Sequence, residues 1–154
     1  PYIAKTGAKI MSLQEPEKKM SKSDTNVNSF ILMTDDADTI LRKFKRAVTD
    51  SEGTVRASED KPGVTNLMSI YSVLTGKDFA AIEKEFEGQG YGVFKEAVAG
   101  SVIDAFRPIQ EEYARILADK TYLDGVLAEG AEKASRMADR MVSKVYKKVG
   151  MLQL

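Results

Sequence analysis

The chain has 154 residues, of which 43% are hydrophobic and 30% are charged, a composition typical of a folded globular protein. Its 23 Lys and Arg residues balance its 23 Asp and Glu residues, so net charge does not indicate a nucleic-acid or membrane partner. Because the chain contains no Cys and no His, disulfides, thiolate nucleophiles, imidazole bases and metal sites with Cys or His ligands are excluded.

The beginning of the chain has no targeting signal. It starts with Pro1 rather than Met, and no apolar run is long enough to cross a bilayer. The lack of Cys fits a reducing compartment. We therefore expect a cytoplasmic protein with no membrane partner, and we expect the sequence to be cut from a longer chain.

The first 30 residues lack helical periodicity. A short apolar group, Ala8–Leu13, is followed by a polar stretch that contains Pro16, which predicts a strand and then a loop. After about residue 30 the apolar pattern becomes helical. The sequence therefore predicts a mainly α fold, in which a short extended lead-in precedes five or six helices.

The first two helices have recognisable boundaries. Hydroxyl and acidic residues at 34–36 predict the start of a helix that extends to about Val48. A loop over Thr49–Gly63 follows; its TDSEG segment is interpreted mainly as turn and cap residues, with a contact to RNA or to an active site as the alternative. Thr65 is predicted to cap the second helix, which Gly76 ends.

Glycine and proline separate the remaining helices. Asp78 is predicted to begin a short helix that ends before GQGYG, Gly88–Gly92, a segment without the spacing of a phosphate-binding loop and therefore interpreted as a turn. The next helix is predicted to kink or restart at Pro108. A last helix is predicted over about Thr121–Lys148, with Gly150 as its stop signal.

The last helix carries a stripe of cations. At 100° per residue, five of its basic residues fall within roughly 80° of one another: Lys133, Arg136, Arg140, Lys144 and Lys147. An adjacent apolar face, Met137, Met141, Val145 and Val149, is predicted to pack, with Met68, Met137 and Met141 as core residues. Two interpretations of the stripe remain open, a solvated helix face and a track for RNA phosphates.

The string KMSKS, Lys19–Ser23, places two ammonium groups three positions apart beside two hydroxyl groups. Lysines are mobile point charges, and they suit a polyphosphate that must be bound, oriented and released. In adenylyl transfer, negative charge grows on the pyrophosphate leaving group, so donors aimed there lower the barrier. Composition alone fits a basic surface loop equally well.

The exact string KMSKS resembles the signature loop of class I aminoacyl-tRNA synthetases. The segments GAKIMSL, KRAVTDSEG, PGVTNLMSIYSVLTG, FEGQGYGVFK and GAEKASRMADRMVSKVY are similar, in order and spacing, to the C-terminal half of bacterial tryptophanyl-tRNA synthetases. The resemblance covers nearly the whole chain. It implies a homodimeric enzyme that activates tryptophan with ATP to tryptophanyl-adenylate and pyrophosphate, and then transfers it to tRNA(Trp).

The resemblance also implies roles for single residues. Lys19 and Lys22 would be the catalytic contacts to the ATP phosphates, and the main chain of Ile10, with Met11 beside it, would lie against adenine. The ATP site would comprise Ile10, Lys19, Met20, Ser21, Lys22 and Ser23. ATP would be used with Mg²⁺, for which this chain offers no identified ligand, and the basic stripe would contact tRNA.

Two domains follow from the same resemblance. Residues 1–30 would be the end of a catalytic nucleotide-binding domain with the KMSKS loop, and residues 31–154 would be a helical domain with the anticodon-recognition surface. The chain has no HIGH-type motif and no alternating strand-helix pattern, so we expect it to be inactive alone, with the tryptophan pocket and most of the dimer interface elsewhere. A stand-alone helical RNA-binding module and a fragment of a tyrosine-type synthetase remain alternatives.

Overall fold

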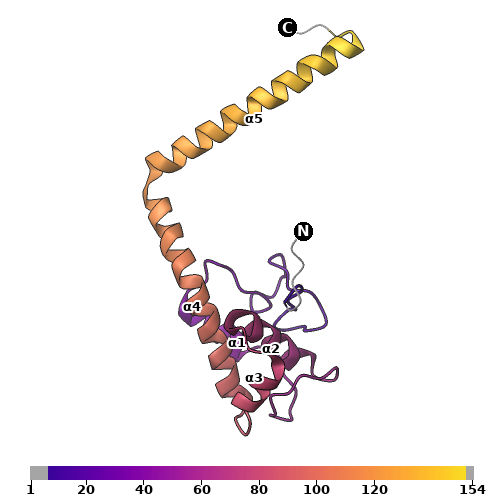
Figure 1. Ribbon diagram of the computed structural model, residues 1–154, viewed down its shortest axis with the longest axis vertical. Coiled ribbons are helices and arrows are strands. Elements are labelled where there is room, and N and C mark those ends of the chain that lie inside the picture. Colours follow the sequence, from indigo (N-terminus) through magenta and orange to yellow (C-terminus); the bar gives the residue numbers. More distant parts are fainter. Residues whose placement is uncertain (1–6, 152–154) are drawn as a thin grey trace. The chain divides into compact units, whose positions relative to one another are not determined.

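A computed structural model describes residues 7–151, which contain five helices (Figure 1): α1 (Ala37–Lys45), α2 (Pro62–Thr75), α3 (Phe79–Glu85), α4 (Tyr91–Ala118) and α5 (Lys120–Val149). The prediction of a mainly α fold with five or six helices is confirmed. The strand predicted within the lead-in is wrong for the described residues, which hold only one isolated antiparallel bridge, between Met11 and Lys19. The first six residues of the predicted lead-in lie outside the described part.

The chain divides into two compact units between Gln110 and Glu111, inside α4. The first unit contains α1, α2, α3 and most of α4, and the second contains the end of α4 and all of α5. Helix α4 runs through Pro108, so the predicted restart at this residue is wrong. The division at residue 30, which the resemblance implies on functional grounds, stays a prediction.

Capping residues and glycines define several helix boundaries as predicted. Asp36 and Asp78 precede α1 and α3, and the carboxylate of each accepts a hydrogen bond from the backbone N–H three residues later, at 2.7 and 2.8 Å. Gly76 and Gly150 end α2 and α5 with φ angles of 74° and 72°. Because side chains are disfavoured at such angles, glycine suits these ends.

The start of α2 differs from the prediction, because Lys61 rather than Thr65 occupies the cap position. Pro62 takes the first helical position, where its fixed φ suits the helix and its missing N–H is not needed. The hydroxyl of Thr65 accepts a hydrogen bond from the N–H of Ser58 and donates one to its carbonyl, both at 3.1 Å. Thr65 therefore holds the preceding loop instead of capping the helix.

The core of the first unit is built around α2. Three rings, Tyr71 of α2, Phe86 at the end of α3 and Phe94 of α4, pack edge to face with centroid distances of 5.0 to 6.2 Å. Met68 is fully buried, as predicted. Because each ring comes from a different element, their packing fixes α2, α3 and α4 against one another.

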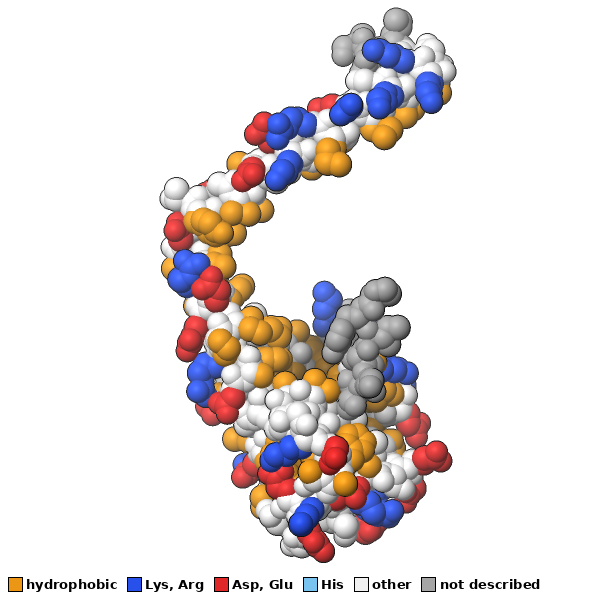
Figure 2. Space-filling view, viewed as in Figure 1, with side chains coloured by type: hydrophobic (Ala, Val, Ile, Leu, Met, Phe, Trp, Pro, Cys, Tyr) orange, Lys and Arg blue, Asp and Glu red, His pale blue; other side chains and the backbone are white. Residues whose placement is uncertain are grey.

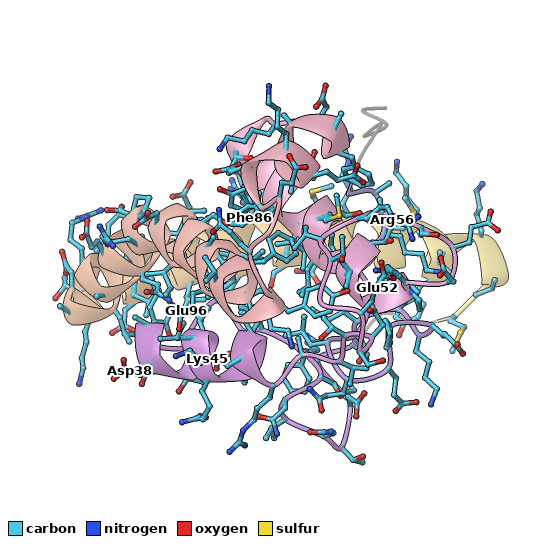
Figure 3. All side chains as sticks on the ribbon, turned by 90° about the horizontal axis from the view of Figure 1, so that it is seen from below. Asp38, Lys45, Glu52, Arg56, Phe86 and Glu96 are labelled. Atoms are coloured by element: carbon cyan, nitrogen blue, oxygen red, sulfur yellow. The ribbon has the colours of Figure 1, made fainter. Side chains whose placement is uncertain are left out.

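Polar contacts join α4 to α1 and to the segments around it. Figure 3 shows Lys45 of α1 and Glu96 of α4 side by side, with a nitrogen-oxygen distance of 2.8 Å. Lys95 donates to the carbonyl of Ala47 at 2.7 Å, and burial lowers the pKa of its ammonium group. Gln110 donates to two carbonyl groups of the segment before α1. These bonds hold the segments on either side of α1 against α4, and an exposed ion pair such as Lys45–Glu96 adds little.

Helix α5 has no buried residue. Met137 and Met141 are 75% and 60% exposed, and Val145 and Val149 are exposed as well. The prediction that this apolar face packs, with Met137 and Met141 in the core, is therefore wrong for the described chain. Figure 2 shows apolar side chains mainly along one side of α5 and basic side chains mainly along the other. None of the helices in the described range is long and apolar enough to cross a membrane.

Replacing Gly63 with Ala is expected to destabilise the first unit. A Cβ atom at this position in α2 would overlap the backbone carbonyl oxygen of Val48, so one of the two backbone segments would have to move. Overpacking of this kind costs roughly 1–3 kcal/mol. We expect Gly63→Ala to lower the free energy of unfolding in urea, followed by circular dichroism.

Gly100→Ala in α4 is the matched control. The added Cβ would meet no atom within 4 Å, and Ala is favoured over Gly by about 1 kcal/mol inside a helix. This variant is expected to be as stable as the parent protein or more so. Equal stability of Gly63→Ala and the parent would contradict the close approach of α2 to Val48.

Candidate functional site

The lysine loop, defined here as Lys19–Ser23, begins on a short backbone ladder. The N–H of Met20 donates to the carbonyl of Ile10 at 3.0 Å, and the N–H of Ser12 donates to the carbonyl of Lys18 at 2.8 Å. These two bonds flank the Met11–Lys19 bridge. The structure therefore places Ile10, the residue expected at adenine, directly beside the first residues of the lysine loop.

The polar side chains of the lysine loop are exposed. Lys19, Ser21, Lys22 and Ser23 all face solvent, and within residues 7–151 neither Lys19 nor Lys22 forms an ion pair. Lys18, just outside the loop, behaves differently: its ammonium group pairs with Glu15, and this hydrogen bond raises the pKa of Lys18. Two lysines of the loop are therefore available to a ligand, whereas their neighbour already has a partner.

An apolar cavity of about 250 Å³ lies next to the ladder. Ile10 and Met20 line one part of it, and Ile70, Val73 and Leu74 of α2 line another. Both Ile10 and Met20 are half-buried and pack against the core. The structure thus separates the residues expected at the ATP site into two that pack on the protein and four that face solvent.

The segment after the lysine loop is fixed by a buried cation. Lys43 of α1 is 4% exposed, and its ammonium group lies 2.6 Å from the Asp35 carboxylate and 5.1 Å from the ring centroid of Phe30. Asp35 also accepts a hydrogen bond from the N–H of Leu32 at 2.9 Å. The pair has its hydrogen bonds in place, as a buried ion pair requires. It therefore fixes the path of the chain from the loop into α1.

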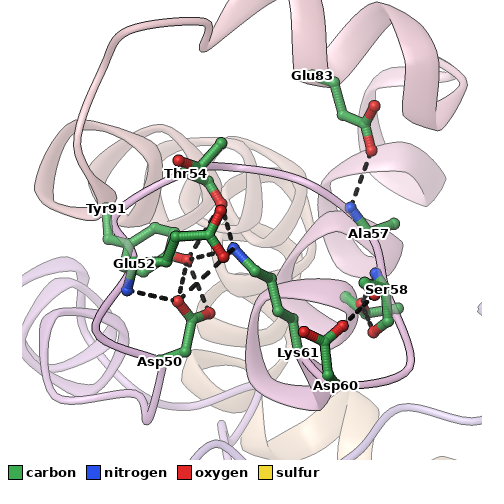
Figure 4. A network of polar contacts seen from close by, with 10 residues as sticks. Asp50, Glu52, Thr54, Ala57, Ser58, Asp60, Lys61, Glu83 and Tyr91 are labelled. Atoms are coloured by element: carbon green, nitrogen blue, oxygen red, sulfur yellow. Dashed lines mark hydrogen bonds and ion pairs between the residues drawn. The ribbon is translucent and has the colours of Figure 1, made fainter.

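A second polar cluster surrounds Lys61, which is 2% exposed (Figure 4). Its ammonium group lies 2.6 Å from Glu52 and 3.7 Å from Asp50, and it donates to the carbonyl of Thr54 and to the Tyr91 hydroxyl. The Tyr91 hydroxyl donates to Asp50 at 2.7 Å. The TDSEG segment and the tyrosine of GQGYG therefore meet in one network whose groups are paired with each other.

The network shifts the pKa values of its members. Burial acts to raise the pKa of Asp50, but the hydrogen bonds from Tyr91 and the Glu52 N–H, together with Lys61, lower it below its usual value. Burial and the bond to Asp50 raise the pKa of Tyr91. Burial acts to lower the pKa of Lys61, but its hydrogen bonds to Glu52 and Tyr91 raise it above its usual value. These shifts favour the charged forms of Asp50 and Lys61 and the neutral hydroxyl of Tyr91, which is the state in which the three groups are paired. They indicate a structural role.

The predicted turn at GQGYG is present at Gly88, between α3 and α4. The segment connects α3 to α4, and Gly88 has a φ angle of 71°. Tyr91 and Gly92 already belong to the first turn of α4. The segment's contribution to the polar network comes from the Tyr91 side chain.

The basic stripe is partly paired on α5 itself. Lys133 lies 3.7 Å from Glu129 and Arg136 lies 3.8 Å from Glu132, and all four side chains are exposed. In the described part of the chain, Arg140, Lys144 and Lys147 have no such carboxylate partner. The C-terminal part of the stripe is therefore the part available to an anionic ligand.

Sequence reasoning did not single out Asn66, a buried residue of α2. Its amide group hydrogen-bonds to both the N–H and the carbonyl of Met11, each at 2.9 Å. A polar side chain in an apolar helix, within the segment NLMSIYSVL, was the signal that marked it. No group of three or more acidic residues suited to a metal ion is present among the described residues.

The depressed pKa of Asp50 predicts a loss of stability in acid. Between its lower folded pKa and its usual value of 3.8, the folded state binds fewer protons than the unfolded state. The contribution of this carboxylate is therefore complete above pH 3.8 and is lost as the pH falls through the folded value. We expect the free energy of unfolding of Asp50→Asn to fall less steeply in this range than that of the parent.

Tyr91→Phe tests the cause of this effect. It keeps the Asp50 carboxylate but removes the hydroxyl that donates a hydrogen bond to it. The free energy of unfolding should therefore again fall less steeply with decreasing pH. Both variants can be followed by urea unfolding at a series of pH values. Parallel curves for Asp50→Asn and the parent would contradict the pKa shift.

Comparisons with known proteins agree with the resemblance. Residues 3–107 match the family described as tRNA synthetases class I (W and Y). The chain is 53% identical over 152 residues to a tryptophan–tRNA ligase of Clostridium tetani, with 99% of this chain and 45% of the relative covered. It is 52% identical to the enzyme of the same name from Clostridium acetobutylicum, with 98% and 45% covered.

The fold is similar to that of a solved structure. The crystal structure of tryptophanyl-tRNA synthetase from Mycoplasma pneumoniae matches with a TM-score of 0.74 and 28% identity, covering 97% of this chain and 45% of that one. The chain therefore spans slightly less than half the length of the curated relatives it matches. Its similarity to tryptophanyl-tRNA synthetases is confirmed, and the chain belongs to the class I tRNA synthetase family of the tryptophan and tyrosine enzymes.

Proposed function

We propose that this chain is part of a tryptophan–tRNA ligase, which forms tryptophanyl-adenylate and pyrophosphate from tryptophan and ATP and then charges tRNA(Trp). The observation that carries the proposal is the lysine loop: two exposed lysines without ion-pair partners in the described chain, on a backbone anchored to the core. The names of the relatives support tryptophan as the amino acid. The proposal includes a cytoplasmic location and a homodimer.

In the proposed reaction, Lys19 and Lys22 contact the phosphates of ATP. As tryptophan attacks the α-phosphate, negative charge moves to the leaving pyrophosphate, and two ammonium groups stabilise that charge more in the transition state than in the ground state. Ser21 and Ser23 add short hydroxyl donors. Mg²⁺ enters with ATP as part of the substrate, and no residue of this chain is assigned to it.

The main chain of Ile10 and the side of the loop at Met20 are proposed to receive adenine. The ladder bond between the Met20 N–H and the Ile10 carbonyl brings these two residues together. Because their side chains pack against the core, the backbone beside them is held in place. A fixed adenine contact and flexible lysine side chains together suit a loop that binds ATP and then releases pyrophosphate.

The division into domains follows from this assignment. Residues 1–30 are proposed as the end of the catalytic nucleotide-binding domain, and residues 31–154 as the helical domain with the anticodon-recognition surface. The basic stripe of α5, Lys133, Arg136, Arg140, Lys144 and Lys147, is the proposed contact to tRNA phosphates. Phosphate contacts of this kind position an RNA but do not read its bases.

Two alternatives differ in the reaction they predict. The family includes enzymes for tyrosine as well as tryptophan, so a tyrosine-type synthetase is the nearer alternative. A helical RNA-binding module without adenylate chemistry is the other. The three candidates are separated by which amino acid, if any, supports the exchange of pyrophosphate into ATP.

We predict that Lys22→Ala lowers tryptophan-dependent exchange of labelled pyrophosphate into ATP by about 10²–10³-fold, because loss of one donor at a developing charge has this typical effect. The measurement uses the full-length protein encoded by the gene. Tyrosine should not support the exchange. The matched control is Lys18→Ala, since the Lys18 ammonium group is already paired with Glu15 and its loss should leave the rate nearly unchanged.

Other results would select an alternative. Exchange that depends on tyrosine would favour the tyrosine-type enzyme. No exchange with either amino acid, together with salt-sensitive RNA binding, would favour the RNA-binding module. Equal losses in Lys18→Ala and Lys22→Ala would contradict the specific role of the lysine loop.

We also predict that replacing Arg140, Lys144 and Lys147 together with Ala weakens binding of tRNA(Trp) and makes it less sensitive to salt. Each lost phosphate contact should reduce the slope of log K against log salt by about 0.7–0.9, so three contacts should reduce it by about 2–3. The dissociation constant can be measured by fluorescence anisotropy over a series of KCl concentrations.

Lys120→Ala is the control for this experiment. Lys120 lies on α5, but at 100° per residue it falls roughly 160° from Arg140 and thus on another face. It should not change the slope. If the triple variant kept the full slope, α5 would not contact RNA phosphates through this stripe.

A further inference from the structure

The backbone N–H and carbonyl of Met11 need hydrogen-bond partners from outside the ladder. The two ladder bonds use the carbonyl of Ile10 and the N–H of Ser12, so Met11 and Lys19 form a pair without hydrogen bonds between them. In an antiparallel ladder, the polar groups of such a residue point away from the opposite segment. In a complete sheet a third strand would satisfy the N–H and carbonyl of Met11.

Asn66 takes the place of that missing strand. Its Oδ1 atom accepts a hydrogen bond from the Met11 N–H, and its Nδ2 atom donates to the Met11 carbonyl, each at 2.9 Å. An amide side chain presents one acceptor and one donor side by side, which is the pattern a peptide group needs. Asn66 is 5% exposed, so water is largely kept from these bonds and a lost partner would not be replaced easily.

The same face of α2 also holds the side chains beside Met11. Ile70, Val73 and Leu74 follow Asn66 by four, seven and eight positions, the spacing of one helical face. They line the cavity together with Ile10 and Met20. One face of α2 therefore binds the backbone of Met11 and lines a cavity together with the side chains of Ile10 and Met20.

We infer that Asn66 is a positioning residue for the lysine loop: by binding both polar groups of Met11, it fixes the ladder that places Lys19 and Met20. In the described chain, the Asn66 amide hydrogen-bonds to the main-chain groups of Met11, so Asn66 acts on the loop through Met11. Its anchoring of the ladder is a property of this fold, whereas its effect on ATP chemistry rests on the proposed function.

Two variants of Asn66 and one control test this inference. Asn66→Ala removes both bonds. Asn66→Asp keeps an acceptor for the Met11 N–H but turns a second oxygen toward the Met11 carbonyl. The control is Thr65→Val, because Thr65 makes the same number of side-chain bonds from the adjacent position of α2, to Ser58 instead.

The first measurement is amide hydrogen exchange by mass spectrometry, which needs no activity. In Asn66→Ala, residues 9–24 should exchange faster while α3 and α4 keep their protection. In Thr65→Val, the faster exchange should be confined to residues near Ser58. Unchanged exchange over residues 9–24 in Asn66→Ala would overturn the inference, and so would loss of protection throughout α2, α3 and α4 in both Asn66 variants.

Asn66→Asp provides an internal rescue. A protonated carboxyl group has one donor and one acceptor, as the amide has, and burial favours the protonated form. The ratio of exchange rates between Asn66→Asp and the parent should therefore approach one as the pH is lowered, while the ratio for Asn66→Ala stays constant. A ratio for Asn66→Asp that does not change with pH would contradict the two-bond arrangement.

The second measurement is pyrophosphate exchange by the full-length protein. We expect kcat for Asn66→Ala to fall about 10–100-fold, because small displacements of catalytic groups have effects of this size, with little change in KM for tryptophan. Thr65→Val should retain its kcat. Faster hydrogen exchange with an unchanged kcat would overturn the positioning role. If the parent itself showed no exchange of pyrophosphate, the proposed function would fall, and hydrogen exchange alone would decide whether Asn66 anchors the ladder.

Discussion

Among residues 7–151, a ladder of two backbone hydrogen bonds has no further strand beside it. Its outward-facing groups therefore need other partners, and this need organises the first unit. Helix α2 supplies them through Asn66, which binds both polar groups of Met11. The neighbouring Thr65 binds Ser58 and so holds the loop before α2. The helix is in turn held by the packing of Tyr71 with rings from α3 and α4. The irregular segments of the unit therefore take their positions from α2 and from the hydrophobic core around it, to which they contribute Leu13 and Val55.

Lysines of this chain differ in role because their surroundings differ. Lys43 and Lys61 are buried among carboxylates, and in these places a cation holds chain segments together. Lys19 and Lys22 are exposed and, within the described residues, have no carboxylate partner. A bound anion would therefore compete only with water for their ammonium groups. The same residue type thus serves as a fixed structural ion in one place and as an available ligand-binding group in another.

Much of the helix pattern could be predicted from the sequence, because caps such as Asp36 and stops such as Gly76 act within one turn of the chain. The motif likewise located the lysine loop. Features that depend on distant partners could not be predicted in this way. Asn66 forms hydrogen bonds with a residue 55 positions away, and the sequence of α2 does not indicate that this residue is Met11. The exposed methionines of α5 show the same limit, since an apolar face predicts packing but not what covers it.

Asn66, the side chain that holds the ladder, is of a type that is prone to deamidation. On prolonged heating, asparagine amides lose ammonia and become aspartate or isoaspartate, and asparagine is depleted in heat-adapted proteins. This deamidation begins when the backbone nitrogen of the next residue attacks the side-chain amide, and it needs a flexible backbone. Asn66 lies inside α2 and is followed by Leu67, a buried residue of the same helix. The helical backbone that orients the Asn66 amide toward Met11 therefore also slows the deamidation of Asn66.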